Sequence, residues 1–295
     1  MSTSRPFSVA DDLALALRLA DIADSLTMAR YQAQDLVIDT KPDLTPVTDA
    51  DMAVERALRE VLQSERPDDL IVGEEFRSAD LDSNLAASMH GTGKHFWVID
   101  PIDGTKNFVR GIPTWATLIG VSTPSQSVIA GVVSAPALHR RWHAGLGLGA
   151  FVNENVFVSQ ADNSISNSNT FAEEKQAKLK KLAVSKVSSL SDAQLSYSDL
   201  IGWGSRKAAF LQLQERVWRT RGFGDFWSHM LVAEGAVDIA VEPQLALWDV
   251  AALEIIVKEA GGEFTNIEGK PGSHGGSLVT SNALLHHHFI EALNA

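Results

Sequence analysis

The sequence predicts an α+β protein of layered architecture. Segments with helical spacing of apolar residues alternate with strand-like segments along the chain, and the middle of the chain has the pattern of antiparallel hairpins. Of the 295 residues 45% are hydrophobic and 21% are charged. A chain of this length and composition can bury one large core or two packed halves, which excludes a wholly disordered or collagen-like chain.

Two helices are expected in the first 65 residues. Ser8 and Asp11 form a capping box before a run in which apolar residues recur every three to four positions. Thr48 and Asp51 form a second box, followed by an apolar face made of Val54, Ala57, Leu58, Val61 and Leu62. Two short strands follow, at 70–73 and 96–99, and both end in acidic residues.

The rest of the chain divides into a hairpin region, an insertion and a second mixed region. Residues 115–158 are expected to form β-hairpins, and the polar, charge-dense segment 159–182 is expected to be a surface insertion. Beyond it we expect strands at 183–187, 236–242, 263–267 and 277–282, with helices at 225–234, 249–260 and 283–293. We therefore treat 1–295 as a single unit with halves at 1–158 and 183–295.

Charge and composition exclude several classes of function. The net charge of −12 argues against a nucleic-acid-binding face. The longest uncharged stretch, 111–138, is interrupted by prolines and matches two strands better than a membrane span, and the first residues lack the apolar core of a signal peptide. Cysteine is absent, which suits a reducing compartment. We expect a cytoplasmic protein.

The segment 97–111, WVIDPIDGTKNFVRG, carries the strongest chemical signal. A strand brings Asp100 to its end, Pro101 stops the ladder, and the turn at Asp103 can open a helix at Gly104 and Thr105. Two carboxylates would then converge beside backbone N–H groups that attract an anion. A divalent cation holding a phosphate resolves that electrostatic conflict. An Asx-turn followed by a helix cap is the simpler alternative.

Three further acidic stretches have the same character. Glu74 follows an apolar strand in Gly73-Glu74-Glu75, Asp249 stands where a helix begins, and Asp49 lies in the first turn of another helix. Asp249 could be an ordinary N-cap, and Asp49 could serve the helix dipole alone.

Together the four stretches resemble the inositol monophosphatase family of metal-dependent, lithium-sensitive phosphatases. The motifs are DLTPVTD at 43–49, GEE at 73–75, WVIDPIDGTKNF at 97–108 and WDVAAL at 248–253, in the family's order and spacing. Pro46 replaces a threonine that many members carry. Within the family, TKPDLTPVTDAD, VVSAPALHRRW and LVAEGAVDIAVEP resemble histidinol-phosphatases of the actinobacterial type. The resemblance implies the layered α-β-α-β-α sandwich of inositol monophosphatases and fructose bisphosphatases.

The resemblance also implies a set of site residues. One metal would be held by Glu74, Asp100 and the carbonyl of Ile102, and a second by Asp100, Asp103 and Asp249. Glu74 could reach a third ion. Because every ligand is an oxygen, the expected ion is Mg²⁺, with two or three per site. The amides of Gly104 and Thr105 would hold phosphate, and the Thr105 hydroxyl, paired with Asp49, would orient the attacking water.

The implied reaction is hydrolysis of a small phosphate monoester by a homodimer, with histidinol phosphate as the expected substrate. The alternatives are inositol 1-phosphate, 3′-phosphoadenosine 5′-phosphate and, in another class, a non-catalytic regulator that binds metal and phosphate. For the ammonium group of histidinol phosphate we expect Asp225 and Glu242, with Arg221 also near the substrate. Asp225 could instead be a plain N-cap.

Overall fold

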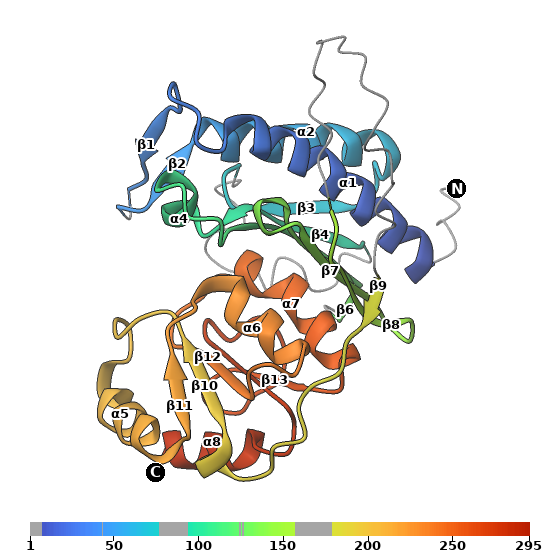
Figure 1. Ribbon diagram of the computed structural model, residues 1–295. Helices are drawn as coiled ribbons and strands as arrows, with labels where there is room; N and C mark the ends of the chain where they lie inside the picture. The colour runs from blue at the N-terminus through green and yellow to red at the C-terminus, as the bar shows by residue number, and fades with distance from the viewer. Residues whose placement is uncertain (1–7, 43, 77–93, 124, 126, 157–178) are drawn as a thin grey trace, which may run out of the picture.

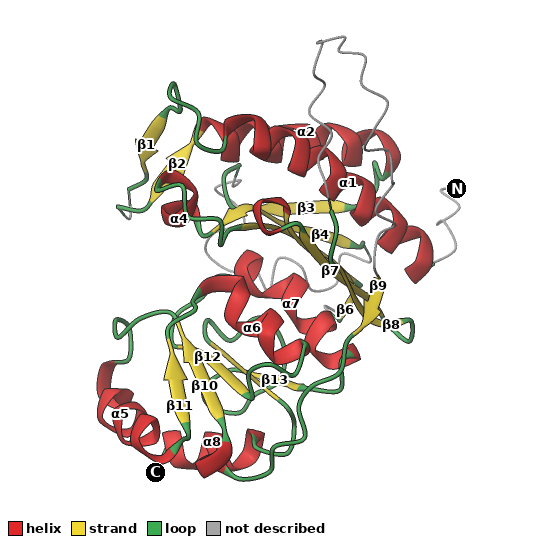
Figure 2. Ribbon diagram, in the orientation of Figure 1, coloured by secondary structure: helices red, strands yellow, loops and turns green. Residues whose placement is uncertain are grey.

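The chain folds into five layers, in the order helices, sheet, helices, sheet, helices (Figure 1). The computed structural model describes residues 8–42, 44–76, 94–123, 125, 127–156 and 179–295. Figure 2 shows the helices as three layers and the two larger sheets between them. The layered α+β class that the sequence predicts and the α-β-α-β-α sandwich that the resemblance implies are therefore confirmed.

The first layer consists of α1 (Val9–Arg30) and α2 (Asp49–Glu65). Ser8 Oγ accepts the Asp11 N–H at 3.2 Å, and Thr48 and Asp51 cap α2 reciprocally, so both predicted helix starts are confirmed. The two helices bury an apolar face against the outer side of the larger sheet, where a core of leucine, alanine, valine, isoleucine and tryptophan side chains is essentially free of solvent. A hairpin of β1 (Ile38–Thr40) and β2 (Pro46–Thr48) joins them.

The larger sheet has seven strands in sequence order, β3-β4-β5-β6-β7-β8-β9. Only β3 and β4 are parallel, and every later pair is antiparallel, as the predicted hairpins require. The strands are β3 (Leu70–Gly73), β4 (Phe96–Asp103), β5 (Ala116–Ser122), β6 (Val128–Ala135), β7 (Arg140–Gly145), β8 (Gly149–Asn153) and β9 (Leu179–Lys181). Short helices follow β4 and β6, namely α4 (Thr105–Val109) and the 3₁₀ turn η1 (Pro136–Leu138).

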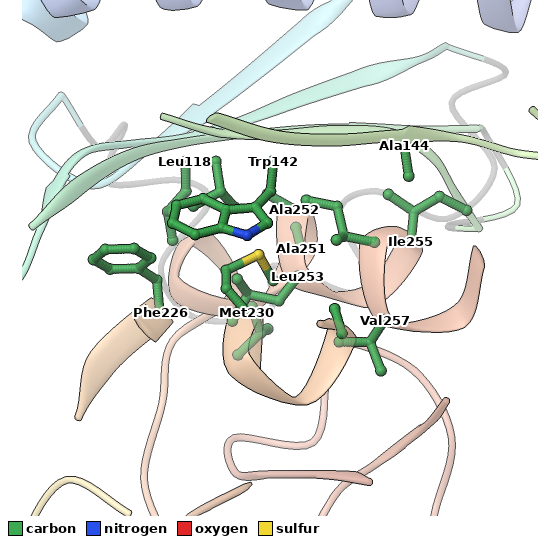
Figure 3. Close-up of a cluster of buried hydrophobic side chains, with 14 of the residues drawn as sticks. Leu118, Trp142, Ala144, Phe226, Met230, Ala251, Ala252, Leu253, Ile255 and Val257 are labelled. Carbon is green, nitrogen blue, oxygen red and sulfur yellow. The ribbon is translucent and has the colours of Figure 1, made fainter. Parts of the chain in front are cut away.

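The central layer, α6 (Asp225–Ala233) and α7 (Leu247–Glu259), packs against the inner face of this sheet. Figure 3 shows Leu118 and Trp142 of the sheet meeting Phe226, Met230 and Leu253 of the two helices. The sheet and α7 lie so close that a Cβ atom at Gly131 would stand 2.6 Å from the carbonyl oxygen of Ala252. Glycine in β6 is therefore required by the close approach of the helix, since its φ is not left-handed.

The second sheet packs below the central helices in the order β11-β10-β12-β14-β13. β10 is parallel to both of its neighbours, whereas β14 is antiparallel to both of its own. Two helices, α5 (Lys207–Arg216) and α8 (His286–Leu293), cover its other face over a third apolar core. The strands are β10 (Gln194–Tyr197), β11 (Arg219–Arg221), β12 (Ile239–Glu242), β13 (Glu263–Thr265) and β14 (Leu278–Ser281), with 3₁₀ turns η2 (Leu190–Asp192) and η3 (Gly204–Arg206).

The structure differs from the sequence-based expectation between the two halves. The predicted strand 183–187 is wrong: this stretch is in no sheet, and its recorded backbone bond joins Val184 N–H to the Ala260 carbonyl. Of the predicted insertion, residues 159–178 lie outside the described residues, whereas Leu179–Lys181 pairs with β8 as β9. A buried Leu182 then anchors the chain in the core between sheet and helices. Apolar alternation alone could not distinguish an extended connection from a strand.

No helix in the described part of the chain is both long and apolar enough to span a bilayer.

Candidate active site

Two carboxylates at the end of β4 share one face of the sheet because of a bulge. Asp100 is paired with Leu118 and Asp103 with Ala116, so three steps along β4 oppose two steps along β5. In a regular strand residues three apart point to opposite faces, and the extra residue brings both carboxylates to the same side. The bulge is held by the Ile102 N–H, which donates to Asp100 Oδ1 at 3.0 Å, and by a Thr117 hydroxyl bond to the Pro101 carbonyl.

Glu74 reaches the same place through strand pairing. The parallel register sets Gly73 against Ile99, and the Glu74 N–H donates to the Ile99 carbonyl at 3.2 Å. Glu74 therefore follows β3 at the level at which Asp100 follows Ile99 on β4. Because both strands run in the same direction, their acidic ends meet at one edge of the sheet, which brings together two residues that the resemblance assigns to one metal.

The central helices contribute a fourth carboxylate, Asp249, and support that of Asp103. Asp249 lies in the first turn of α7, where its Oδ2 accepts the Ala246 N–H at 2.7 Å. Asp103 Oδ2 accepts the Phe226 N–H at the start of α6 at 2.8 Å. One oxygen each of Asp100, Asp103 and Asp249 lies within 4.8 Å of the others. The predicted metal ligands from distant parts of the chain are thus brought together.

Burial and mutual repulsion raise the pKa of the three aspartates of this cluster. Burial, followed by the charge of Glu74 and the neighbouring aspartates, holds the pKa of Asp100 well above its ordinary value. Burial and the Asp225 charge do the same to the pKa of Asp103, and burial raises the pKa of Asp249 to about 7. A divalent cation would remove this repulsion. An all-oxygen ligand set of this kind fits a hard ion such as Mg²⁺.

The carboxylates open into a polar cavity of about 530 Å³ between the two halves of the chain. Most of the predicted site residues line it: Glu74, Asp100, Ile102, Asp103, Gly104, Thr105, Asp225 and Asp249. The structure adds residues to which the sequence analysis assigned no role at the site: Thr45, Pro46, Lys106, Asn107, Ser198, Asp199, Gly222, Phe223, Gly224, Ala246 and Trp248.

α4 begins beside the cluster at Gly104. The Gly104 φ of +83° is left-handed, and a Cβ there would stand 3.1 Å from the Thr114 carbonyl oxygen and 3.4 Å from Asp225 Oδ2. Glycine is therefore required both by conformation and by space. The Thr105 hydroxyl donates to the Ile102 carbonyl at 3.0 Å. The first amides of a helix have no partner within it, so this turn presents donors beside the acidic cluster.

Asp49 does not line the cavity. Its Oδ2 binds Arg30 Nη2 at 2.7 Å, and 37% of its side chain is exposed. Asp51 does not line the cavity either, but it is fully buried, and its charge contributes to the raised pKa of Asp100. Burial, with a smaller contribution from Glu74, raises the pKa of Asp51 itself to about 6.

Asp51 was visible in the sequence only as the acidic member of a capping box. Thr48 donates to Asp51 Oδ2 through both its N–H and its hydroxyl. The other oxygen, Oδ1, is buried without a hydrogen-bond partner among the described residues, as is Oδ1 of Asp49. The capping role uses one oxygen of Asp51 and leaves the second without a donor, and the charge of Glu74 adds to the raised pKa of this carboxyl. The segment TDAD, residues 48–51, carries two aspartates, and the sequence analysis assigned the site role to the first of them. The position of the second aspartate was the signal that it missed.

Arg221 and Glu242 also lie outside the cavity lining. The exposed Arg221 guanidinium donates to the Thr220 carbonyl. Glu242 is buried behind Ser198, whose hydroxyl donates to the Glu242 carboxyl and accepts the Asp225 N–H at 3.0 Å. Asp225 does line the cavity, and its Oδ2 accepts from Asn107 at 3.2 Å. Ser198 therefore links the two acidic residues that the sequence analysis considered together.

Lys41 is a cation within the acidic region. It lies at the turn of the β1–β2 hairpin, and its Nζ is 2.6 Å from both Glu74 Oε1 and Glu75 Oε1. Burial nevertheless raises the pKa of Glu75 to about 7. The hairpin brings Thr45 and Pro46 to the cavity wall on the same side.

Comparisons with known proteins agree on one family. A sequence model of the inositol monophosphatase family matches residues 9–295. A histidinol-phosphatase of Mycobacterium tuberculosis is 50% identical over 97% of this chain and 98% of its own, and one of Streptomyces coelicolor is 47% identical over 96% and 97%. Among solved structures, an IMPase of Thermotoga maritima superposes with a TM-score of 0.75 at 27% identity, covering 96% of this chain and 97% of its own.

The buried Glu242 predicts a pH-dependent stability. Burial, opposed in part by Ser198, raises its pKa from 4.5 to about 8, so it stays protonated in the fold at pH values where the unfolded chain ionises. Its contribution to stability is therefore complete below about pH 4.5 and is lost as the pH rises through 8. Glu242→Gln copies the protonated form. In EDTA, the free energy of unfolding in urea should increase for the variant relative to the wild type from pH 5 to pH 8. If the two free energies change in parallel with pH, Glu242 does not have a raised pKa in the fold.

Proposed function

The chain belongs to the inositol monophosphatase family, and we propose that it is a metal-dependent phosphomonoesterase that converts L-histidinol phosphate and water to L-histidinol and phosphate. The observation that supports phosphate chemistry is the convergence of Asp100, Asp103 and Asp249 beside the first turn of α4. The substrate assignment is supported by two relatives named histidinol-phosphatase, each about half identical over nearly the whole chain. Inositol 1-phosphate and 3′-phosphoadenosine 5′-phosphate are the competing substrates.

The acidic cluster would hold Mg²⁺, in two or three sites. Glu74, Asp100 and the Ile102 carbonyl would form one ligand set, and Asp100, Asp103 and Asp249 the other. Bound there, the ions would polarise the phosphoryl group and stabilise the negative charge that develops on the departing oxygen. Because Asp100 belongs to both sets, it is the ligand whose loss should matter most.

The start of α4 would bind the phosphate. Its first amides belong to Gly104 and Thr105, which line the same cavity as the acidic cluster, and they would donate to phosphate oxygens. The Thr105 hydroxyl, now bonded to the Ile102 carbonyl, would turn to position the attacking water. We assign the acidic partner of this hydroxyl to Asp51 rather than Asp49, because Asp51 is buried next to the cluster whereas Asp49 pairs with Arg30.

The far side of the cavity suits a cationic leaving group. Asp225 and Asp199 line it. Glu242 is buried behind Ser198, outside the lining, and Ser198 joins it to Asp225 by hydrogen bonds. Histidinol carries an ammonium group, which carboxylates bind through charge-assisted hydrogen bonds. This acidic wall favours histidinol phosphate over inositol phosphate and over the anionic adenosine bisphosphate.

Three finer properties belong to the same proposal. A homodimeric assembly and sensitivity to lithium rest on the family resemblance alone, and a cytoplasmic location suits the absence of cysteine. A non-catalytic regulator is the remaining alternative, and it is disfavoured because every expected metal-ligand residue and Thr105 are present.

Phosphate release from a substrate panel tests the proposed function. The panel contains histidinol phosphate, inositol 1-phosphate, 3′-phosphoadenosine 5′-phosphate and fructose bisphosphate. With Mg²⁺, kcat/KM should be highest for histidinol phosphate. EDTA should abolish the activity reversibly, and Asp100→Asn should reduce it to on the order of 1% or less. A higher kcat/KM for another member of the panel would reassign the substrate, and activity in EDTA would remove the metal from the mechanism.

A matched pair of variants tests the acidic partner of Thr105. Asp51→Asn should lower kcat by about 10²–10⁴-fold, the range for general acid–base assistance, with a smaller change in KM. Asp49→Asn loses only the ion pair with Arg30 and should retain kcat within a few-fold. Steady-state kinetics at saturating Mg²⁺ measure kcat and KM for both variants. A larger loss of kcat in Asp49→Asn than in Asp51→Asn would identify Asp49 as the partner of Thr105.

Asp225→Asn tests recognition of the ammonium group. A desolvated carboxylate–ammonium hydrogen bond contributes about 1.5–3 kcal/mol, so kcat/KM for histidinol phosphate should fall by about 10- to 150-fold. Hydrolysis of glycerol phosphate, which has no ammonium group, should change little. If both substrates lose activity equally, Asp225 supports the start of α6 and does not select the substrate.

A further inference from the structure

α2 contains a buried carboxylate that the proposed mechanism does not use. Glu55 is completely buried and lies beside the segment that follows β3. Its Oε2 accepts the Glu75 N–H at 2.7 Å, while Oε1 accepts the Phe76 N–H at 3.2 Å and Arg59 Nε at 2.7 Å. Glu55 thus binds the backbone directly after Glu74.

Gly73 provides the space for this carboxylate. A Cβ atom at position 73 would stand 2.0 Å from Glu55 Oε1, 2.3 Å from its Cδ and 2.6 Å from its Oε2. The φ of Gly73 is not left-handed, so the backbone conformation does not itself require glycine. The residue before Glu74 is glycine because the Glu55 carboxyl group packs against its Cα.

Glu74 is therefore held from both sides. On the sheet side its N–H donates to the Ile99 carbonyl, one residue before Asp100. On the helix side Glu55 packs against residue 73 and binds the amides of residues 75 and 76. Arg59 completes the support, since its Nη2 donates to the Phe76 carbonyl at 2.9 Å and its charge compensates Glu55.

An ion pair within α2 alone would not need these contacts. Glu55 and Arg59 are four residues apart and could pair on any helix surface. Here both Glu55 oxygens are also aimed at backbone N–H groups of another segment. Burying a carboxylate is costly unless donors surround it, so this carboxyl group holds residues 73–76 in one conformation.

We propose that Glu55 is a positioning residue: packed against Gly73 and bonded to the Glu75 and Phe76 amides, it orients the Glu74 carboxylate toward Asp100 for metal binding. The inference rests on the proposed function, because it assumes that Glu74 is a metal ligand. Groups that orient metal ligands typically change metal affinity by about 10–100-fold when they are replaced.

Glu55→Gln is the first test. Glutamine has the same shape, but its NH₂ group would face a donor where the carboxylate accepts. Glu55→Gln therefore breaks the paired hydrogen bonds to the amides of residues 75 and 76. Asp24→Asn is the matched control, because Asp24 is also a buried carboxylate paired with an arginine, Arg141, but belongs to α1 and lies outside the cavity. Both variants should lose stability in urea unfolding.

Metal affinity should separate the two variants. Titration calorimetry with Mg²⁺ or Mn²⁺ alone should show at least about tenfold weaker binding for Glu55→Gln and wild-type affinity for Asp24→Asn. Equal affinities for Glu55→Gln and the wild type, or equal weakening by both variants, would overturn the positioning role. A wild type that binds no metal would instead overturn the proposed function on which the inference rests.

Gly73→Ala provides a second, independent test. In the wild-type background the added methyl group collides with Glu55, so stability and metal affinity should both fall. In a Glu55→Ala background the space is already empty, and adding Gly73→Ala should change metal affinity less than twofold. Additive effects of the two substitutions would mean that Gly73 does not serve the Glu55 carboxylate. Circular dichroism on each variant identifies any that fail to fold.

Discussion

The structure depends on holding several buried and half-buried carboxylates against their mutual repulsion. Asp100, Asp103 and Asp249 each place an oxygen within 4.8 Å of the others, and the pKa of every one is raised. Folding must supply the free energy for this arrangement, since repulsion and burial both oppose it. The compensation comes from amide donors at the bulge of β4 and at the starts of α6 and α7, and from the apolar cores on either side.

The five-layer architecture explains how the cluster is assembled. The larger sheet supplies Glu74, Asp100 and Asp103 from the ends of two parallel strands, and the central helices supply Asp249 and the amides that bind Asp103. α7 can approach the sheet closely because β6 carries Gly131 at the crossing. The core drawn in Figure 3 therefore fixes the distance between the two halves of the site as well as the packing of the layers.

Around the cluster, buried polar side chains determine where the acidic groups point. Glu55 binds the backbone after Glu74, and Ser198 joins Glu242 to the start of α6. These groups tie the site to elements outside it, since Glu55 belongs to α2, Glu242 belongs to β12 and Ser198 follows β10. The acidic wall formed by Asp199 and Asp225 belongs to the second half of the chain, which also supplies Asp249, so this half would contribute both to selecting the leaving group and to binding metal.

The sequence by itself determined the layered α+β class, the starts of α1 and α2, the hairpin region and most of the acidic cluster, because caps, strand ends and the DPIDGT turn are local features. Only the tertiary structure decided which of two chemically similar neighbouring residues belongs to the site. Asp49 and Asp51 share one helix turn, yet one pairs with Arg30 and the other is buried beside Glu74. The same holds for residues 183–187, which alternate like a strand but have no strand beside them. Which face is buried, and what pairs with it, depends on contacts between segments distant in the chain, and no local pattern contains those contacts.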